Sequence, residues 1–557
     1  MRSVGTTDDR RLTTDGQGAI RDLNSLVLPG IFILALVIRL LILFTAEGYL
    51  RSDEAVVGIM ARHIVTKHEF PLFLYGQDYG GGHALVAYIA APLFAVFGMS
   101  GTLLTAISMT FGLANILLIA IVLRRYFPKW VVWSGTLLYA VAPAAVYGNF
   151  LVNGATEAIF FSLIGLMFFI SDFYAERSVL WRPFGAGVMC GIAYWCMDFT
   201  VVYPVMYVVL WAIYRRRRFI ERLLVFLSGC VVGALPVIYY DVTHNFAHFS
   251  RMVLGAGTGG SLIGRATEAF ASMWLHDLPQ FLTVNIDDFM GRASWDSWAH
   301  YLVFVAAIVS CIIWVSRSRK ADIAKRPSPE VIALAHLAVF CVLYSVSHFS
   351  SPLLRTPRYF TPLYPFFAVI IASGLYRAAG GRAGGIVAAG LVGLLAIQGI
   401  ARDSQMMFTD KHQEWRITTS GKAVTALASF LESHNIHYVL TPYEIQWRLI
   451  FESRERIIAS SSGLSRIDRY PDYDIAFHDH VSLKGEPCAV VFDKDFKFAA
   501  LGGTLTKEAW YEFLGKMDAR CSTVEVGGEF VVFYDFTKNI FPREMGRAGT
   551  GATAPRE

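Results

Sequence analysis

Long apolar blocks alternate with short polar connections along most of the chain. A helix needs roughly 20 apolar residues to cross the hydrocarbon core of a bilayer, and most of the blocks approach that length. The stretch 185–214 carries Asp198 near its middle and predicts two short helices that meet at a polar tip. The whole pattern predicts about eleven transmembrane helices. The other blocks are 26–46, 102–123, 131–147, 159–171, 223–240, 331–349 and 359–376, with weaker ones at 301–315 and 386–400.

One further apolar block is too short to cross. Residues 84–97 contain Pro92 and fall below the roughly 20 residues that a crossing helix requires. We expect them to form a helix that lies at the outer membrane surface. The first outer loop then extends over residues 47–101.

Basic residues are divided unequally between two alternating sets of loops. The loops 47–101, 148–157, 241–300 and 350–358 hold 8 Lys and Arg residues, whereas the N-terminal segment and the remaining loops of 26–400 hold 21. Positive charge concentrates in cytoplasmic loops. We therefore expect a cytoplasmic N-terminus, an uncleaved signal anchor as the first helix, and an extracytoplasmic C-terminal segment. The net charge of +5 is dispersed among these loops, so nucleic acid is not an expected partner.

The composition of the chain also indicates an integral membrane protein. Of its 557 residues, 55% are hydrophobic and 17% are charged, whereas soluble domains carry about a quarter charged residues. The expected fold class is an α-helical polytopic membrane protein with a C-terminal extracytoplasmic α/β domain, located in the cell (plasma or inner) membrane. The expected divisions are a cytoplasmic tail (1–25), a transmembrane domain (26–400), the outer domain (401–546) and a disordered tail (547–557).

The outer domain has its own local patterns. Apolar residues at helical spacing predict a helix over 422–434, and 438–440 and 489–492 are typical of strands. Cys488 and Cys521 are the only cysteines of this domain. Because the expected compartment permits disulfides, the sequence predicts a bond between them.

Ionisable residues at membrane level are expensive and therefore mark candidate sites. On the expected outer side these residues are Arg51, Asp53 and Glu54 after the first helix, Glu157 and Asp198 at helix ends, and Arg355 and Arg358 before a later helix. An alternative interpretation is that each carboxylate only marks a helix N-terminus, where the helix dipole favours negative charge. Arg39 lies inside the first helix, where it could pair with an outer acid or a lipid phosphate, or reach the interface with its long side chain.

A divalent cation stays open as a cofactor. Asp241, His244 and His248 would share one helix face at spacings that can hold a metal, although most such His pairs are ordinary polar helix ends. Asp53 and Glu157 are the other candidate ligands. The glycine-rich run 254–264 does not follow a strand and lacks the GK[ST] signature, so it predicts an outer loop and no nucleotide site.

Several segments together resemble a known family. They are Ser52-Asp53-Glu54-Ala55 with Gly58, Phe70-Pro71, the apolar helix that ends at Phe97-Gly98, and Pro357-Arg358-Tyr359-Phe360-Thr361-Pro362-Leu363-Tyr364-Pro365. Over about residues 26–400 the chain resembles the GT-C superfamily of membrane glycosyltransferases, in particular glycosyltransferase family 39, the protein O-mannosyltransferase and lipid A aminoarabinose transferase type.

The resemblance implies an activity and a set of site residues. It implies transfer of a sugar from a polyprenyl phosphate to an envelope acceptor (lipid, glycan or protein) at the outer face of the membrane. Asp53 matches the family's proposed catalytic base or metal ligand, and Glu157 matches a second acidic position. The family often has Lys-Pro-Pro where this chain reads Gly76-Gln77-Asp78-Tyr79-Gly80-Gly81-Gly82. Without that lysine, Arg358, Arg355 or Arg51 would have to bind the donor phosphate.

Two other functions fit the same helices. A lipid-linked saccharide transporter or flippase would also use membrane arginines, but such proteins often contain internal repeats, and no convincing repeat occurs in the sequence. An envelope receptor or scaffold built around the outer domain would leave Asp53, Glu54 and Glu157 without a role. The glycosyltransferase is therefore the preferred hypothesis.

Overall fold

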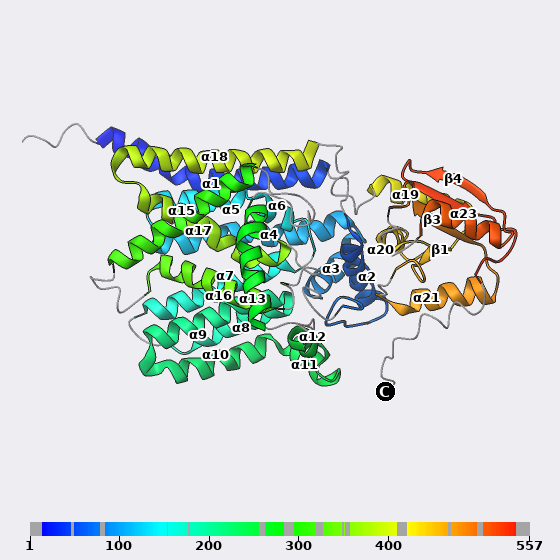
Figure 1. Ribbon diagram of the computed structural model, residues 1–557, viewed down its shortest axis with the longest axis horizontal. Coiled ribbons are helices and arrows are strands. Elements are labelled where there is room, and N and C mark those ends of the chain that lie inside the picture. The colour runs from blue at the N-terminus through cyan, green and yellow to red at the C-terminus, as the bar shows by residue number, and fades with distance from the viewer. Residues whose placement is uncertain are drawn as a thin grey trace, which may run out of the picture.

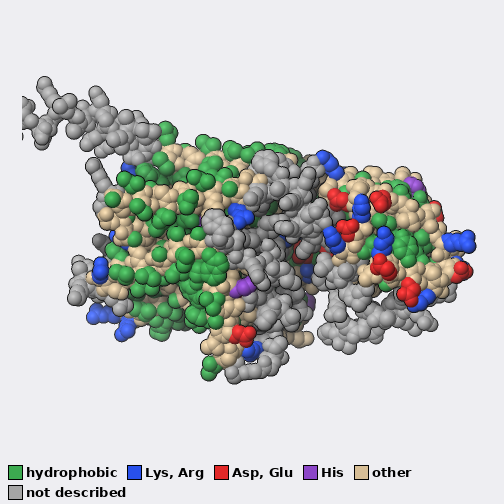
Figure 2. Space-filling model, turned by 45° about the horizontal axis from the view of Figure 1, so that its top comes forward, with side chains coloured by type: hydrophobic (Ala, Val, Ile, Leu, Met, Phe, Trp, Pro, Cys, Tyr) green, Lys and Arg blue, Asp and Glu red, His purple; other side chains and the backbone are tan. Residues whose placement is uncertain are grey.

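The computed structural model describes residues 14–45, 50–77, 84–152, 154–175, 179–254, 262–282, 295–318, 327–347, 350, 357–408, 420–465, 469–497 and 505–541. A helical part and a C-terminal domain lie at opposite ends of the molecule, and helices α2 and α3 lie between them (Figure 1). Hydrophobic side chains gather over the helical part, whereas acidic and basic side chains are frequent over the C-terminal domain (Figure 2). This division is the one that the apolar blocks predict.

The helical part is built from α-helices and short 3-10 and π turns. Its elements are α1 (Thr14–Thr45), α4 (Gly101–Tyr126), α5 (Lys129–Ala140), α6 (Pro143–Gly148), α7 (Ala155–Tyr174), α8 (Trp181–Cys196), η1 (Asp198–Val201), α9 (Val202–Tyr214), η2 (Arg216–Arg218), α10 (Phe219–Gly233), α11 (Leu235–Thr243), α12 (Ala247–Leu254), α13 (Leu262–Ser272), η3 (Met273–Asp277), α14 (Leu278–Phe281), α15 (Trp295–Ser318), α16 (Pro329–Val346), η6 (Pro357–Leu363), α17 (Tyr364–Ala378) and α18 (Gly381–Phe408).

Within the described residues, seven helices are long and apolar enough to cross a membrane, or eight if the bent pair α10–α11 is one span. The expected number of about eleven included shorter pieces such as α5 and the two helices that meet at Asp198. Those pieces are present as α5, α8 and α9, with 12, 16 and 13 residues. The seven long spans are Leu26–Phe44, Gly101–Tyr126, Ala155–Tyr174, Ser297–Arg317, Pro329–Val346, Tyr359–Ala378 and Ala383–Ser404.

Two apolar blocks do not form the single helices that the sequence predicted. The block 131–147 is divided between α5 and α6, where Pro143 is the first residue of α6. The block 223–240 bends by 68° between α10 and α11, and Pro236 lies in the first turn of α11. Proline has no backbone N–H and clashes with the preceding turn, so it fits the start of a helix and interrupts a longer one. Hydrophobicity by itself did not distinguish a straight span from a broken one.

Helices α8 and α10 pack with their backbones in close contact. Gly187 and Gly191 of α8 face Gly229 and Gly233 of α10, and a Cβ at any of the four positions would overlap backbone atoms of the opposite helix. Two glycines spaced four residues apart on each helix permit this approach. The pair α8–α10 is therefore held by shape as well as by hydrophobicity.

Replacing Gly229 by Ala should lower the free energy of unfolding by about 1–3 kcal/mol, the usual cost of an overfilled core. The new methyl group would meet the carbonyl oxygen of Phe184 and the amide of Val188. Thermal unfolding in detergent measures the change. Gly390→Ala in α18 is the control, because no atom lies within 4 Å of its added Cβ. Equal unfolding midpoints for the two variants would show that the close contact contributes nothing.

The loop 47–101 contains two helices, α2 (Ser52–Thr66) and α3 (Leu85–Phe97). Helix α3 has 13 residues, which span about 20 Å and are too few to cross. Its buried side packs on α2, whereas Val96 and Phe97 at its end are exposed. This geometry fits the expectation that residues 84–97 do not cross.

The C-terminal domain contains a five-stranded sheet with the order β2-β1-β3-β5-β4. Strands β1, β2 and β3 are mutually parallel, with Tyr438 opposite Ile458 and Cys488, and β5 pairs antiparallel with β3 and β4. The elements of the domain are α19 (Gly421–Ser433), β1 (Tyr438–Leu440), α20 (Tyr443–Glu452), β2 (Ile458–Ser460), α21 (Pro471–Phe477), η7 (His478–Leu483), β3 (Cys488–Asp493), α23 (Lys507–Lys516), β4 (Ser522–Val526) and β5 (Phe530–Tyr534).

One hydrophobic core joins the loop 47–101 to the C-terminal domain. It includes Ile59 of α2, Phe94 of α3 and Leu104 of α4 together with Phe451 of α20. Gly58 is the point of closest approach, because a Cβ there would overlap the ring of Phe451. The C-terminal domain is therefore packed against α2 through a buried apolar surface.

The predicted disulfide is wrong, because Cys488 and Cys521 are both free thiols. Cys488 begins β3 and Cys521 precedes β4, and β5 lies between these strands. Two strand spacings amount to about 9–10 Å, whereas a disulfide requires Cα atoms within about 7 Å. The order of the strands, which the spacing of the cysteines does not reveal, excludes the bond.

Candidate functional site

Asp53 lies in the first turn of α2, a few residues after α1 ends at Thr45. The N-terminus of a helix favours a carboxylate, because its unpaired backbone N–H groups carry partial positive charge. The Asp53 side chain remains 48% exposed, whereas Ser52 and Glu54 beside it are buried. A substrate group could therefore reach Asp53 from the solvent.

Two side chains of the C-terminal domain hold the Asp53 carboxylate. The Tyr443 hydroxyl donates to its Oδ1 at 2.5 Å, and the Arg469 guanidinium donates to the same oxygen at 3.1 Å. Arg469 also donates from Nε to the Tyr443 oxygen at 2.9 Å. Burial, reinforced by the negative charge of Asp53, raises the pKa of Tyr443 well above its usual value. Tyr443 therefore stays protonated and remains a donor.

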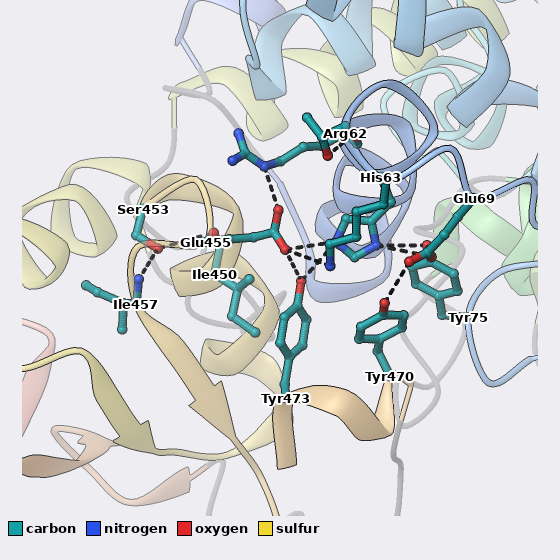
Figure 3. Close-up of polar contacts among 12 residues, drawn as sticks. Arg62, His63, Glu69, Tyr75, Ile450, Ser453, Glu455, Ile457, Tyr470 and Tyr473 are labelled. Carbon is teal, nitrogen blue, oxygen red and sulfur yellow. Dashed lines mark hydrogen bonds and ion pairs between the residues drawn. The ribbon is translucent and has the colours of Figure 1, made fainter. Parts of the chain in front are cut away.

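A second polar cluster holds the other end of α2 (Figure 3). Glu455 accepts a hydrogen bond from His63 Nε2 at 2.8 Å, forms an ion pair with Arg62 at 2.5 Å and accepts from the Tyr473 hydroxyl at 2.9 Å. Lys67 lies 3.4 Å from the same carboxylate. Burial alone would raise the pKa of Glu455, but the hydrogen bonds from His63 and Tyr473 and the nearby positive charges lower it well below the usual range.

A second carboxylate extends this cluster. Glu69 accepts from Tyr75 at 2.5 Å and from Tyr470 at 2.8 Å. Burial opposes ionisation of Glu69, but the two tyrosine hydrogen bonds and the charges of His63 and Lys67 lower its pKa. The residues Arg469, Tyr470 and Tyr473 all belong to one short segment of the C-terminal domain. That segment therefore contacts both ends of α2.

Arg51 and Glu54 lie beside Asp53 but in different surroundings. Arg51 precedes α2, and its guanidinium lies 5.4 Å from the centre of the Tyr147 ring. Glu54 is buried in the packed side of α2. Arg51 and Asp53 are both partly exposed, whereas Glu54 is buried, so Asp53 is the accessible carboxylate of the two.

Glu157 occupies the N-terminus of α7 and is fully buried. The Ser108 hydroxyl of α4 donates to its Oε1 at 2.6 Å, and its Oε2 has no hydrogen-bond partner. Among the described residues, no hydrogen bond or ion pair joins Glu157 to Asp53. The Glu157 side chain is thus buried, and one of its carboxylate oxygens can accept a further hydrogen bond.

Two of the three arginines predicted to bind the donor phosphate lie in the later loop 350–358. Arg355 and the side chain of Arg358 are outside the described residues, although the backbone of Arg358 is part of η6. Arg51 is therefore the predicted phosphate ligand whose position is known.

Asp241, His244 and His248 do not share one helix face, which the open possibility of a metal site there required. The helix ends at Thr243, and Asn245 and Phe246 have positive φ values of 53° and 57° before α12 begins. His244 is exposed and hydrogen-bonds the Tyr240 carbonyl, whereas His248 is buried 3.5 Å from Asp198. Asp241 accepts from the backbone amide of Phe249. Among the described residues, no three His, Cys, Asp or Glu side chains form a group that could hold a metal ion.

Arg39 is fully buried inside α1 and does not reach the interface. It donates to the Asn149 side chain at 2.7 Å and to the carbonyls of Ala35 and Ala140. Asp403 of α18 is buried close enough to interact with it electrostatically. The packing of α1 against neighbouring helices supplies Asn149 and Ala140, whereas Nη2 of Arg39 has no hydrogen-bond partner among the described residues.

One pocket lies on the C-terminal domain, away from Asp53. It has a volume of about 520 Å³ and is lined by Asp472, Ile475, Ala476, Asp479, His480, Leu483 and Lys484. None of the predicted site residues lines it. We therefore place the candidate site at the N-terminus of α2, where the exposed carboxylate is.

Sequence reasoning missed Tyr443 and Arg469, which complete the surroundings of Asp53. They lie 390 and 416 residues further along the chain. The only local signal is the concentration of Arg469, Tyr470 and Tyr473 just before and inside α21. A segment of this composition indicates polar interactions. Only the packing of the domain identifies Asp53 as one of its partners.

Comparison with solved structures identifies proteins of similar fold. The crystal structure of ArnT from Cupriavidus metallidurans bound to undecaprenyl phosphate aligns with a TM-score of 0.60 at 14% identity, over 92% of this chain and 99% of that chain. The apo structure of the same protein gives 0.58 at 13% identity, over 91% and 98%. Archaeal oligosaccharyltransferase AglB from Archaeoglobus fulgidus gives 0.48 at 14% identity, over 84% and 69%. No protein-family model and no curated protein matches the chain.

Proposed function

Because this chain has the GT-C fold of membrane glycosyltransferases, we propose that it transfers a sugar from a polyprenyl phosphate to a hydroxyl of an envelope acceptor. The proposal is carried by Asp53, a half-exposed carboxylate at the N-terminus of α2. ArnT, which shares the fold, has been crystallised with undecaprenyl phosphate. The outer face of the cell membrane is the proposed location, with the C-terminal domain on the same side.

The chemistry needs a base and a cation. The acceptor hydroxyl oxygen forms a bond to the anomeric carbon while the bond from that carbon to the phosphate oxygen breaks. The electron pair leaves with the carrier phosphate, and the hydroxyl proton passes to the Asp53 carboxylate, its general base. The leaving phosphate needs no proton if a cation stabilises its growing charge. Arg51, which precedes α2, is a candidate cation, and Arg355 and Arg358 remain proposed partners.

Glu157 has a secondary place in the proposal. Its buried carboxylate has one oxygen without a hydrogen-bond partner, which is unusual for a buried polar atom. A hydroxyl of a bound sugar or a cation would satisfy that oxygen. Glu54 is buried, as Glu157 is, so Asp53 is the best placed of the three proposed acids to take a proton from a substrate.

Transfer by the purified protein in liposomes tests the function. The assay supplies a panel of polyprenyl-phosphate sugars with envelope lipids and glycans as acceptors, and it follows release of the carrier phosphate. We expect release that depends on an added acceptor. A protein that moves labelled donor between leaflets with the sugar–phosphate bond intact would instead be a lipid-linked saccharide flippase.

A further inference from the structure

We propose that the C-terminal domain completes the active site by supplying Arg469 and Tyr443 as positioning residues for the Asp53 carboxylate. The inference rests on the proposed function, because it assigns these residues a role in the reaction of Asp53. It also gives the C-terminal domain a task in catalysis. Both residues act through Asp53 and are not proposed to touch the substrate.

The three side chains form a closed triangle of hydrogen bonds. Arg469 and Tyr443 both donate to Oδ1 of Asp53, and Arg469 donates to Tyr443. Arg469 is only 7% exposed and Tyr443 is buried, whereas Asp53 is 48% exposed. Two buried donors thus fix one exposed acceptor. Such an arrangement holds a carboxylate in one orientation and leaves it accessible from outside.

The triangle is not needed to attach the domain. The ring of Phe451 packs against Gly58, and the cluster around Glu455 binds the other end of α2. Helix α2 has 15 residues, so its two ends are about 20 Å apart. The docking contacts therefore persist without Arg469. An Arg469–Asp53 pair that served only to attach the domain would duplicate these contacts. This redundancy favours a role for Arg469 in positioning the Asp53 carboxylate.

The positive charge of Arg469 has a consequence that can be measured. A neighbouring cation favours the ionised form of a carboxylate. The acidic limb of a pH–rate profile reports the ionisation of a catalytic base. Removing the Arg469 charge should therefore move that limb to higher pH, whereas a purely structural ion pair would alter the amount of folded protein and leave the limb in place.

The experiment compares Arg469→Met, Arg469→Lys and Tyr443→Phe with wild type in the liposome transfer assay at several pH values. We expect Arg469→Met to move the acidic limb of kcat/KM upward by about 1 pH unit or more and to lower kcat about tenfold or more. Arg469→Lys keeps the positive charge. It should therefore retain part of the wild-type kcat and keep the acidic limb of the pH–rate profile close to its wild-type position. Arg456→Met is the matched control, because Arg456 pairs with Glu432 at an exposed site.

Tyr443→Phe keeps the inference testable if Arg469→Met does not fold. It removes one donor to Asp53 and the acceptor of the Arg469 Nε hydrogen bond while keeping the ring, so we expect a lower kcat in a protein that still folds. The inference is overturned if Asp53→Asn is inactive but both Arg469→Met and Tyr443→Phe keep the wild-type rate and acidic limb. If Asp53→Asn is itself active, the proposed base is wrong and the positioning role falls with it.

Discussion

Replacing Asp53 by Asn should lower turnover by about 10²- to 10⁴-fold, the usual cost of losing a general base. Asn cannot act as a base for the hydroxyl proton of the sugar acceptor. It keeps an oxygen that can accept hydrogen bonds from Tyr443 and Arg469. It also caps a helix about as well as Asp. The geometry at the start of α2 should therefore survive while the proton acceptor is lost. Turnover in liposomes at matched protein amount measures the effect.

The control for this substitution is Asp518→Asn in the C-terminal domain. Asp518 also accepts from a basic side chain, that of Lys538 at 2.6 Å, but it is largely exposed. We expect its turnover to equal that of wild type. If Asp53→Asn stayed within about threefold of wild type, far short of the loss expected for a base, Asp53 would have only a capping role. Glu157 and Glu54 would then be the remaining acids to test.

Replacing Glu455 by Gln should lower the free energy of unfolding by about 1–3 kcal/mol, the usual cost of weakening hydrogen bonds to a charged, partly buried group. The Glu455 carboxylate accepts hydrogen bonds from His63 and Tyr473 and forms ion pairs with Arg62 and Lys67. Gln keeps one oxygen that can accept from the buried His63 ring, but it removes the negative charge that faces Arg62 and Lys67. We expect the contact between α2 and the C-terminal domain to loosen, with a lower thermal unfolding midpoint.

The same carboxylate predicts how stability depends on pH. The pKa of Glu455 is lowered in the folded protein, from about 4.3 in an unfolded chain. Its contribution to stability is therefore complete above about pH 5 and is lost as the pH falls through the lower folded value. The difference in unfolding midpoint between wild type and Glu455→Gln should be constant from pH 7 to pH 5 and should shrink below about pH 4.

An exposed Glu–Arg pair of the same domain supplies the matched control. Glu432 forms an ion pair with Arg456 at 2.9 Å, with both side chains partly exposed. Such surface pairs contribute about 0–1 kcal/mol, so Glu432→Gln should hardly change the unfolding midpoint. A Glu455→Gln midpoint that matched that of Glu432→Gln would mean that the cluster at the far end of α2 does not stabilise the fold.

The sequence by itself determined the helical class and the start of the site. Apolar blocks have to be removed from water wherever they lie, so their lengths predicted the membrane helices and excluded residues 84–97 as a span. Asp53 was predicted as a site residue from its place a few residues after the first membrane helix and from the resemblance of Ser52-Asp53-Glu54-Ala55 to a glycosyltransferase family. Both inferences depend on residues that are neighbours in the chain, which is why they could be made without coordinates.

Only the tertiary structure decided which distant groups meet. His248 pairs with Asp198 instead of sharing a helix face with His244, because the chain turns at Asn245. Cys488 and Cys521 are separated because a strand late in the sequence inserts between theirs. Arg469 reaches Asp53 because a buried core joins α2 to the C-terminal domain. Hydrophobic periodicity is local, whereas the contacts that complete this site form only when segments hundreds of residues apart pack together.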